Sequence, residues 1–145
     1  MLPQFDESGL LPPGIYNCDL EEIKQRLTYN QRRQQLFDGL QRYIDIWVGS
    51  QFLSEVYVDG SFVTAKDEPG DIDLLLVPTQ EALALQGTEL DEMLRTYCID
   101  RDFTKQEYGC EAFPALPEAN LVEWLDFFGH DKINRPRGII KVPMQ

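Results

Sequence analysis

The chain is poor in the residues from which several common active sites are built. It contains one histidine, His130, and three cysteines, Cys18, Cys98 and Cys110, in 145 residues. The cysteines are odd in number and lack the spacing of zinc ligands, which predicts buried, reduced thiols. The sequence has no Gly-x-Ser-x-Gly elbow, no phosphate loop ending in Gly-Lys-Ser/Thr and no dinucleotide-binding glycine pattern. These absences exclude a serine hydrolase built on that elbow, a zinc finger and the two familiar glycine-rich nucleotide sites.

Basic residues are also scarce. Lysine and arginine together number 13 against 25 aspartates and glutamates, which gives a formal net charge of −12. Proteins that hold long nucleic acids usually carry a basic surface, because phosphate contacts supply most of their affinity. We therefore do not expect this chain alone to hold a long nucleic acid. A nucleoside triphosphate bridged by metal and a basic partner protein are both compatible with the charge.

No apolar run approaches membrane-spanning length, and the first residues lack the basic and apolar segments of a signal peptide. We therefore expect a cytoplasmic protein without a membrane association. The length predicts one domain, residues 1–145, with no room for a separate substrate domain. Its first part, residues 1–18, is rich in Pro and Gly and is predicted to lie extended as a strap over the fold.

Hydrophobic periodicity predicts alternating helices and strands. Helices are expected near residues 20–28, 30–48, 79–85, 90–98 and 121–128, and strands near 56–59, 71–77, 108–113 and 139–142, the last at a sheet edge. Arg32 and Arg33 belong to the polar side of the second helix, which we interpret as a solvated face; contacts to phosphates or RNA are the alternative. Arg135, Arg137 and Lys141 form the one basic cluster, interpreted as charge on an edge strand or as a contact to a partner.

The most informative stretch is an apolar strand that ends in a Gly-Ser turn at 60–61 and is followed, after a gap of nine residues, by Asp71-Ile72-Asp73. Side chains two apart on a strand share a face, so Asp71 and Asp73 should project together while Ile72 faces the core. The apolar run 74–77 predicts that this strand is covered on both sides. Neighbouring carboxylates repel unless a cation lies between them. The pattern therefore predicts a metal or nucleotide site, with a turn-capping Asp-x-Asp as the alternative.

These motifs resemble the signature of the DNA polymerase β-type nucleotidyltransferase superfamily. The chain as a whole is similar to its short, minimal members, a largely uncharacterised group with relatives in toxin–antitoxin and phage-defence pairs. The similar segments are 2–5, 9–15, 59–66, Trp124, 127–128 and 137–140. The resemblance implies an α/β (α+β) nucleotidyltransferase-like fold, in which a small mixed sheet carries helices mainly on one face and a cleft opens on the other.

The resemblance also implies a metal site. Asp71 and Asp73 would be ligands of Mg²⁺ or Mn²⁺, and a third carboxylate from a neighbouring strand would complete the catalytic set. The candidate is Glu111, where the family pattern more often has Asp. Because Glu is one methylene longer and metal positioning is sensitive to such changes, a Glu111 that simply faces solvent is the alternative.

The Gly-Ser turn would hold the triphosphate of ATP or another nucleoside triphosphate. Gly60 allows close approach of the backbone, and Ser61 offers a hydroxyl and an amide to an anion. Thr64 and Lys66 match the family core in the spacer, and Lys66 could pair with a phosphate. As the alternative, Lys66 is an ordinary loop lysine beside Asp67.

The function expected from this resemblance is metal-dependent transfer of a nucleoside monophosphate, most simply AMP from ATP, to a hydroxyl of a protein or nucleic-acid acceptor. The acceptor could be a tyrosine of a partner toxin. One alternative is a weakly active or inactive binding module of the same fold that acts through a protein partner. A second alternative is a metal-dependent phosphohydrolase or nuclease that uses the same carboxylates.

Overall fold

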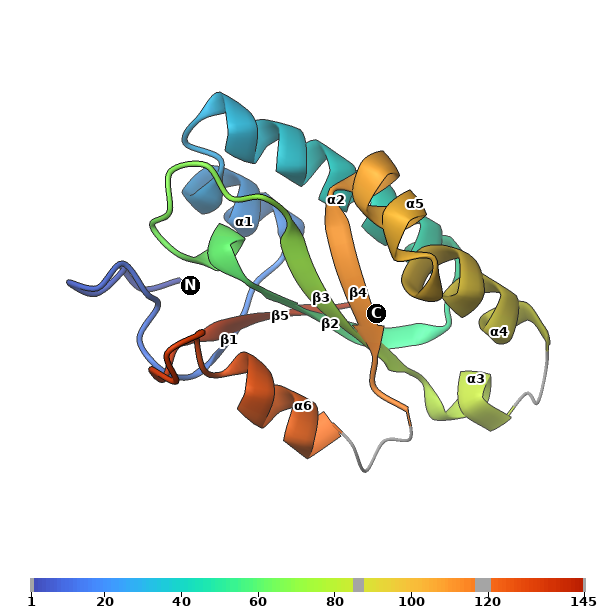
Figure 1. Cartoon of the computed structure of the whole chain (residues 1–145). Coiled ribbons are helices and arrows are strands. Elements are labelled where there is room, and N and C mark those ends of the chain that lie inside the picture. The colour runs from blue at the N-terminus through green and yellow to red at the C-terminus, as the bar shows by residue number, and fades with distance from the viewer. Residues whose placement is uncertain (1, 85–87, 117–120, 145) are drawn as a thin grey trace.

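The computed structural model describes residues 2–84, 88–116 and 121–144, which form a mixed five-stranded sheet flanked by helices (Figure 1). The strands are β1 (Ile15–Asn17), β2 (Leu53–Asp59), β3 (Ile72–Pro78), β4 (Cys110–Pro114) and β5 (Ile139–Pro143). Their spatial order is β1-β5-β2-β3-β4. The predicted α/β (α+β) class with a small mixed sheet is confirmed.

Two pairings at the centre of the sheet determine where polar side chains meet. The strands β2 and β3 are antiparallel, with Asp59 opposite Asp73. The strands β3 and β4 are parallel, with Asp73 aligned with Glu111. Because neighbouring strands lie about 4.8 Å apart, this register brings three acidic positions into one row across the sheet.

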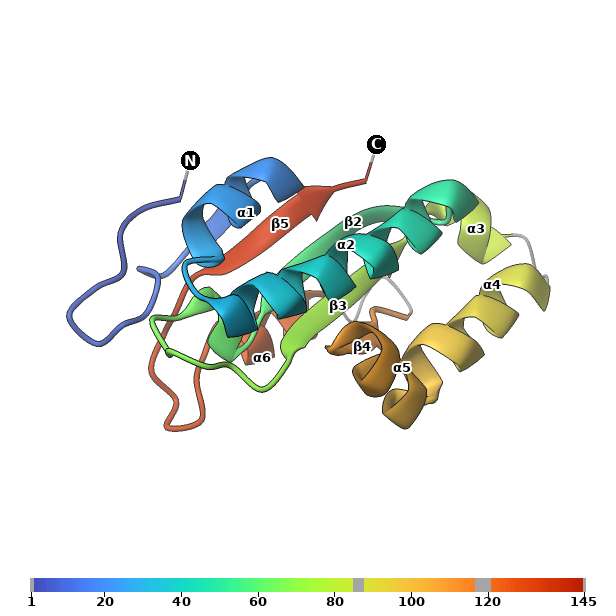
Figure 2. The same ribbon diagram turned by 90° about the horizontal axis from the view of Figure 1, so that it is seen from above.

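Helices cover one face of the sheet almost completely. They are α1 (Leu20–Leu27), α2 (Gln31–Ser50), α3 (Gln80–Ala84), α4 (Thr88–Leu94), a π-helical turn (Arg95–Ile99) and α5 (Arg101–Tyr108). Figure 2 shows α1 and α2 over the sheet on this side, where their apolar stripes pack on Val56, Val58 and Leu74. Side-chain oxygens of Asp19 and Asn30 cap the first two helices.

On the opposite face, the one α-helix among the described residues is α6 (Leu121–Phe128) (Figure 1). A smaller apolar cluster lies beneath it and includes Tyr57, Leu75 and Phe128. Alternate residues of β3 therefore pack into two different clusters, and the prediction that this strand is covered on both sides is confirmed. Since α6 covers only part of its face, the remainder of that face stays open above the acidic row.

Three details of the sequence prediction are wrong. The last strand, β5, is not at an edge: it lies between β1 and β2, because β1 adds to it in parallel. Residues 101–108 form α5, whose single buried residue, Thr104, leaves no apolar stripe to reveal a helix. Tyr108 consequently ends that helix, Gly109 follows with φ +67°, and the strand begins only at Cys110. Position 85 of the predicted helix 79–85 lies outside the described residues.

From residue 2 onward, the N-terminal segment contains no helix before β1 (Ile15–Asn17). Leu2, Leu10 and Leu11 are buried, whereas Ile15 is 49% exposed and does not anchor the segment. The carbonyls of Leu2 and Pro3 accept hydrogen bonds from the guanidinium of Arg26. In the described parts of the chain, the helices are all too short or too polar to cross a membrane.

Two glycines of α2 provide a matched test of this packing. A Cβ at Gly39 would lie 2.2 Å from the backbone oxygen of Tyr108, whereas a Cβ at Gly49 would meet nothing within 4 Å. We expect Gly39→Ala to lower the free energy of unfolding by about 1–3 kcal/mol, because α2 and α5 must separate. Gly49→Ala should leave it unchanged or raise it by up to about 1 kcal/mol. Urea unfolding measures both; equal effects would contradict the close α2–α5 packing.

Candidate metal centre

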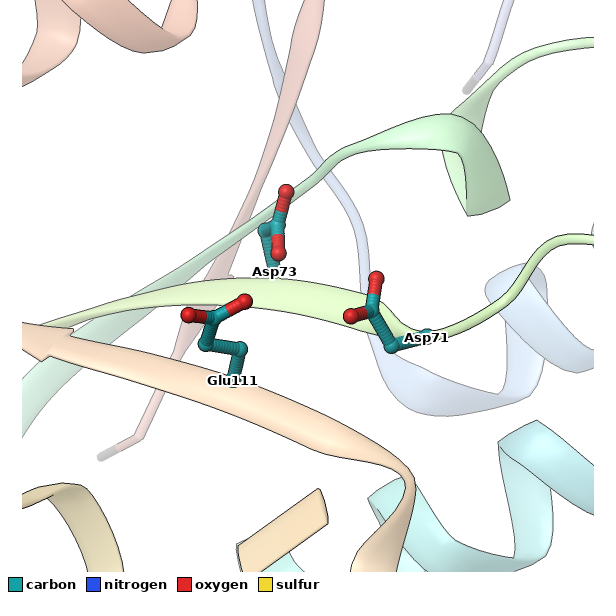
Figure 3. Close-up of side chains that lie close together, drawn as sticks. All are labelled: Asp71, Asp73 and Glu111. Carbon is teal, nitrogen blue, oxygen red and sulfur yellow. The ribbon is translucent and has the colours of Figure 1, made fainter. Parts of the chain in front are cut away.

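Three carboxylates converge on the open face of the sheet (Figure 3). Asp71 and Asp73 alternate with Ile72, which is fully buried on the helix-covered side. The parallel register of β4 places Glu111 beside Asp73. One oxygen from each of Asp71, Asp73 and Glu111 lies within 4.8 Å of the others, and all three residues are partly buried. The predicted projection of Asp71 and Asp73 to one side is thus what the backbone produces, and Glu111 joins them.

The central carboxylate of this group, Asp73, is the one without an ion pair among the described residues, and only the more distant charge of Arg137 opposes the rise of its pKa. Asp71 pairs with Lys105 at 3.4 Å, and Glu111 pairs with Arg101 at 3.6 Å. Among the described residues, Asp73 has no ion pair. Burial, reinforced by the negative charge of the surrounding carboxylates, raises the pKa of Asp73 to about 7. A cation bound here would relieve the repulsion that the protein's own side chains leave uncompensated.

A fourth acid, Asp59, lies behind the group and was given no role by the sequence analysis. It stands opposite Asp73 in the sheet and is fully buried. Its Oδ2 accepts a hydrogen bond from Arg137 at 3.1 Å, while Oδ1 is buried without a partner in the part of the chain that the structure describes. Burial raises the pKa of Asp59 to about 6, against the opposing charge of Arg137. The sequence feature that could have identified Asp59 is its position at the end of an apolar strand, directly before the Gly-Ser turn.

Gly60 is required at the turn for two reasons. Its φ is +89°, which residues with a side chain rarely adopt. A Cβ at this position would also lie 2.8 Å from Oδ2 of Asp73. The Gly-Ser turn therefore approaches the acidic group as closely as a backbone can. Ser61 opens a short 3-10 turn (Ser61–Val63), and its carbonyl accepts a hydrogen bond from the hydroxyl of Thr64 at 2.7 Å.

Thr64 and Lys66 differ in what they can offer a ligand. Thr64 is 9% exposed, and its hydroxyl is already engaged with Ser61 and with the amide of Lys66. It therefore stabilises the turn. The side chain of Lys66 is exposed and free to reach an anion in the cleft described below.

Arg33 and Arg32 hold the spacer between the Gly-Ser turn and Asp71. Arg33 is fully buried, and its guanidinium donates to the carbonyls of Phe62, Thr64 and Lys66. Arg32 donates to the carbonyls of Pro69 and Gly70. The interpretation of these arginines as a solvated helix face is wrong. Hydrophobic periodicity could not reveal the burial of Arg33, because a guanidinium has five donors and can be buried wherever enough carbonyls surround it.

A cleft of about 1530 Å³ opens over the carboxylates. Its lining includes Asp59, Asp71 and Asp73 but not Glu111. All four residues predicted to bind the nucleotide line it, namely Gly60, Ser61, Thr64 and Lys66. The opposite wall comes from the end of α6 and the following loop, where Phe127 and Ile133 are 69% and 72% exposed. Arg137 belongs to this wall and not to an edge strand.

The donor set is that of a site for a hard cation, since carboxylate oxygens are the ligands that such ions prefer. The side chains of Asp71, Asp73 and Glu111 are separated by distances that one ion can span. Asp59, paired with Arg137, lies directly behind them, opposite Asp73 in the sheet. These residues can therefore hold a metal ion.

A family model described as "Family of unknown function (DUF6932)" matches residues 3–143. The chain belongs to this family. Nothing among the curated proteins or the solved structures matches it. Because the description of DUF6932 names no activity, the function must be argued from the geometry of the site.

The raised pKa of Asp73 predicts how the stability of this DUF6932 protein depends on pH. Its ordinary value is 3.8 and its folded value is about 7, so between these limits the folded state binds a proton that the unfolded state has lost. Without metal, the free energy of unfolding should therefore fall as pH rises from about 4 to 7. In Asp73→Asn, the decrease in the free energy of unfolding that comes from the titration of Asp73 should be absent.

Urea unfolding in a chelator at pH 5 and pH 8 measures the effect. Added Mn²⁺ should stabilise the wild type more at pH 8 than at pH 5, because at pH 5 it must displace the proton. Identical pH profiles for the wild type and Asp73→Asn would contradict the assignment.

A second pair of glycines tests the turn. Gly60→Ala should weaken Mn²⁺ binding by at least about tenfold, since the new methyl group displaces the carboxylate of Asp73. Gly70→Ala adds the same methyl group in the spacer, where it would meet nothing within 4 Å. Its Mn²⁺ affinity, measured by titration calorimetry, should stay within about twofold of wild type. Equal losses in both variants would show that the contact between Gly60 and Asp73 does not control the site.

Proposed function

We propose that this protein is a metal-dependent nucleotidyltransferase that moves a nucleoside monophosphate, most simply AMP from ATP, onto a hydroxyl. The observation that carries the proposal is the convergence of Asp71, Asp73 and Glu111 within 4.8 Å, beside the turn whose Gly60 approaches Asp73. The similarity of the chain to minimal nucleotidyltransferases involves these same residues, the Gly-Ser turn and the Asp71–Asp73 pair above all. No other cluster of three or more potential metal ligands occurs in the part of the chain that the structure describes.

In the proposed reaction, the acceptor oxygen attacks the α-phosphorus, the bond to the β-phosphate oxygen breaks, and pyrophosphate leaves. Mg²⁺ or Mn²⁺ held by the carboxylates would neutralise charge on the phosphates and favour the ionised acceptor. Glu111, the outermost carboxylate, would accept the proton of the acceptor hydroxyl. The turn at Gly60 and Ser61 would hold the triphosphate, and the exposed side chain of Lys66 would pair with it.

The pair of Asp59 and Arg137 would position Asp73. Arg137 neutralises Asp59 from behind, so the oxygens of Asp73 are repelled less by that neighbour and remain directed toward the ion. Arg33 would act at a greater distance by fixing the spacer carbonyls, which keeps the turn and Asp71 in register. None of these three residues needs to touch the substrate.

The cleft is large enough for both substrates. Ligand sites of small molecules usually occupy about 300–1000 Å³, and this cleft measures about 1530 Å³. The exposed ring of Phe127 and the side chain of Ile133 provide an apolar wall on which a nucleobase could stack. The space that remains suits a side-chain hydroxyl of an acceptor.

For the acceptor we propose a protein, such as a tyrosine of a partner toxin, by similarity to the minimal enzymes of toxin–antitoxin and defence pairs. The net charge of −12 supports a basic protein surface over a long nucleic acid. The reaction would take place in the cytoplasm, in keeping with three free, buried cysteines.

One observation favours the alternative of a non-catalytic binding module. Lys105 and Arg101 neutralise Asp71 and Glu111, so two of the three carboxylates are satisfied without any ion. In that case the protein would bind its partner equally well after metal and nucleotide are removed. Calorimetry of the complex in a chelator separates the two functions.

The transferase is tested with α-labelled nucleoside triphosphates, Mg²⁺ or Mn²⁺ and the product of the adjacent gene as acceptor. We expect label on the acceptor with release of pyrophosphate, and a loss of about 100-fold or more in Asp71→Asn and Asp73→Asn. Asp126→Asn is the matched control, since it removes a carboxylate of the same cleft that lies outside the cluster.

Transfer that is absent in wild type would contradict the proposal, as would equal activity in all these variants. Free phosphate or cleaved RNA without a labelled adduct would instead indicate a phosphohydrolase or nuclease.

A further inference from the structure

Two cations on one side of α5 reach the acidic cluster from beyond the edge of the sheet. Arg101 and Lys105 are four residues apart, so they lie on the same face of this helix. Arg101 pairs with Glu111 at 3.6 Å and Lys105 pairs with Asp71 at 3.4 Å. Both cationic side chains are well exposed, at 64% and 60%, whereas their acidic partners are 30% and 22% exposed.

The fold places the helix that carries these cations beside the acidic cluster. The helix α5 packs on α2 and continues through Gly109 directly into β4, the strand that carries Glu111. The guanidinium of Arg101 also lies over the ring of Phe113, 5.3 Å from its centroid, on the same face of β4 as Glu111. The backbone of the helix is therefore held by its packing, while most of each cationic side chain is exposed to solvent.

We infer that Arg101 and Lys105 form a phosphate-binding pair that Asp71 and Glu111 occupy until a divalent cation takes those carboxylates. The inference rests on the proposed function and extends it: it adds two cations to the phosphate-binding residues proposed above and names the contact that keeps these cations occupied beforehand.

The reason is electrostatic. A divalent ion bound at about 2.0–2.1 Å from the same oxygens repels an ammonium or guanidinium group that lies within 4 Å of them. The displaced cations then need another anion close by. A phosphate group bound to the metal supplies several negative charges and matches the fork of an arginine. Arg101 and Lys105 are the cations that already lie within 4 Å of these two carboxylates.

A consequence is that metal and phosphate bind with coupled affinities. Without phosphate, the ion must compete with two cations for Asp71 and Glu111, so its affinity is lowered. With phosphate present, the same two cations add to the binding of the ligand. Removing them should therefore change the two affinities in opposite directions, which a purely structural role would not do.

The experiment uses the full chain with Arg101→Gln, Lys105→Gln and the double variant. Lys24→Gln is the matched control, because Lys24 is an exposed lysine of α1 that has no ion pair in the described chain. Titration calorimetry first measures Mn²⁺ binding without nucleotide. It then measures the binding of inorganic tripolyphosphate and of ATP at saturating Mn²⁺.

In the double variant we expect Mn²⁺ to bind about three- to tenfold more tightly, and tripolyphosphate and ATP about tenfold more weakly. The control should stay within about twofold of wild type in each titration. Tighter Mn²⁺ binding with unchanged tripolyphosphate binding would overturn the phosphate-binding role. Unchanged affinities throughout would overturn the whole inference, and so would a wild type that binds no Mn²⁺.

Failure of the proposed transferase has a different signature. The two opposite shifts would then be observed as expected, while label from α-labelled ATP reached no acceptor.

Discussion

The main physical constraint on this protein is the repulsion among the carboxylates that the sheet brings together on its open face. Register alone aligns Asp59, Asp73 and Glu111 across β2, β3 and β4, and alternation along the chain adds Asp71 to them. Such a concentration of negative charge opposes folding unless cations offset it. Arginine and lysine side chains offset three of these acids. The carboxylate left over, Asp73, lies at the centre, and its proton or a metal ion must supply the missing positive charge.

The rest of the structure keeps this group in place against that repulsion. On the helix-covered side, fully buried residues such as Ile72, Leu74 and Val58 anchor the two central strands in the main core. In the segment between the Gly-Ser turn and Asp71, the buried guanidinium of Arg33 donates hydrogen bonds to backbone carbonyls. An arginine is suited to this task because its donors have a rigid geometry and its charge is permanent. The acidic side chains therefore belong to elements that are held together by the core and by Arg33. These elements do not separate to relieve the repulsion among the carboxylates.

The same arrangement connects the acidic cluster to the cleft. The loop after α6 provides Arg137, which reaches under the site to Asp59, and also the exposed Ile133 on the facing wall. On the other side, α5 provides the cations that neutralise the outer carboxylates. Under the proposed function, the cleft thus combines a site for a cation with an apolar wall for a base, and α5 adds positive groups for phosphates at the outer carboxylates. An acidic protein can bind a nucleotide in this way because the ion and a few local cations, not the overall charge, contact the phosphates.

The sequence by itself determined the central strands, the Gly-Ser turn and the pair of Asp71 and Asp73, because alternation along a strand and the freedom of glycine are local properties. It also placed Glu111 on a neighbouring strand, although only as one of two alternatives. Tertiary structure alone decided that Glu111 aligns with Asp73, that Asp59 joins the row, and that β5 lies inside the sheet. It also decided the roles of Arg33, Arg101, Lys105 and Arg137, which contact residues far away in the chain or on another element. Strand order and ion pairing depend on which segments meet in space, and no periodicity within a single segment encodes that.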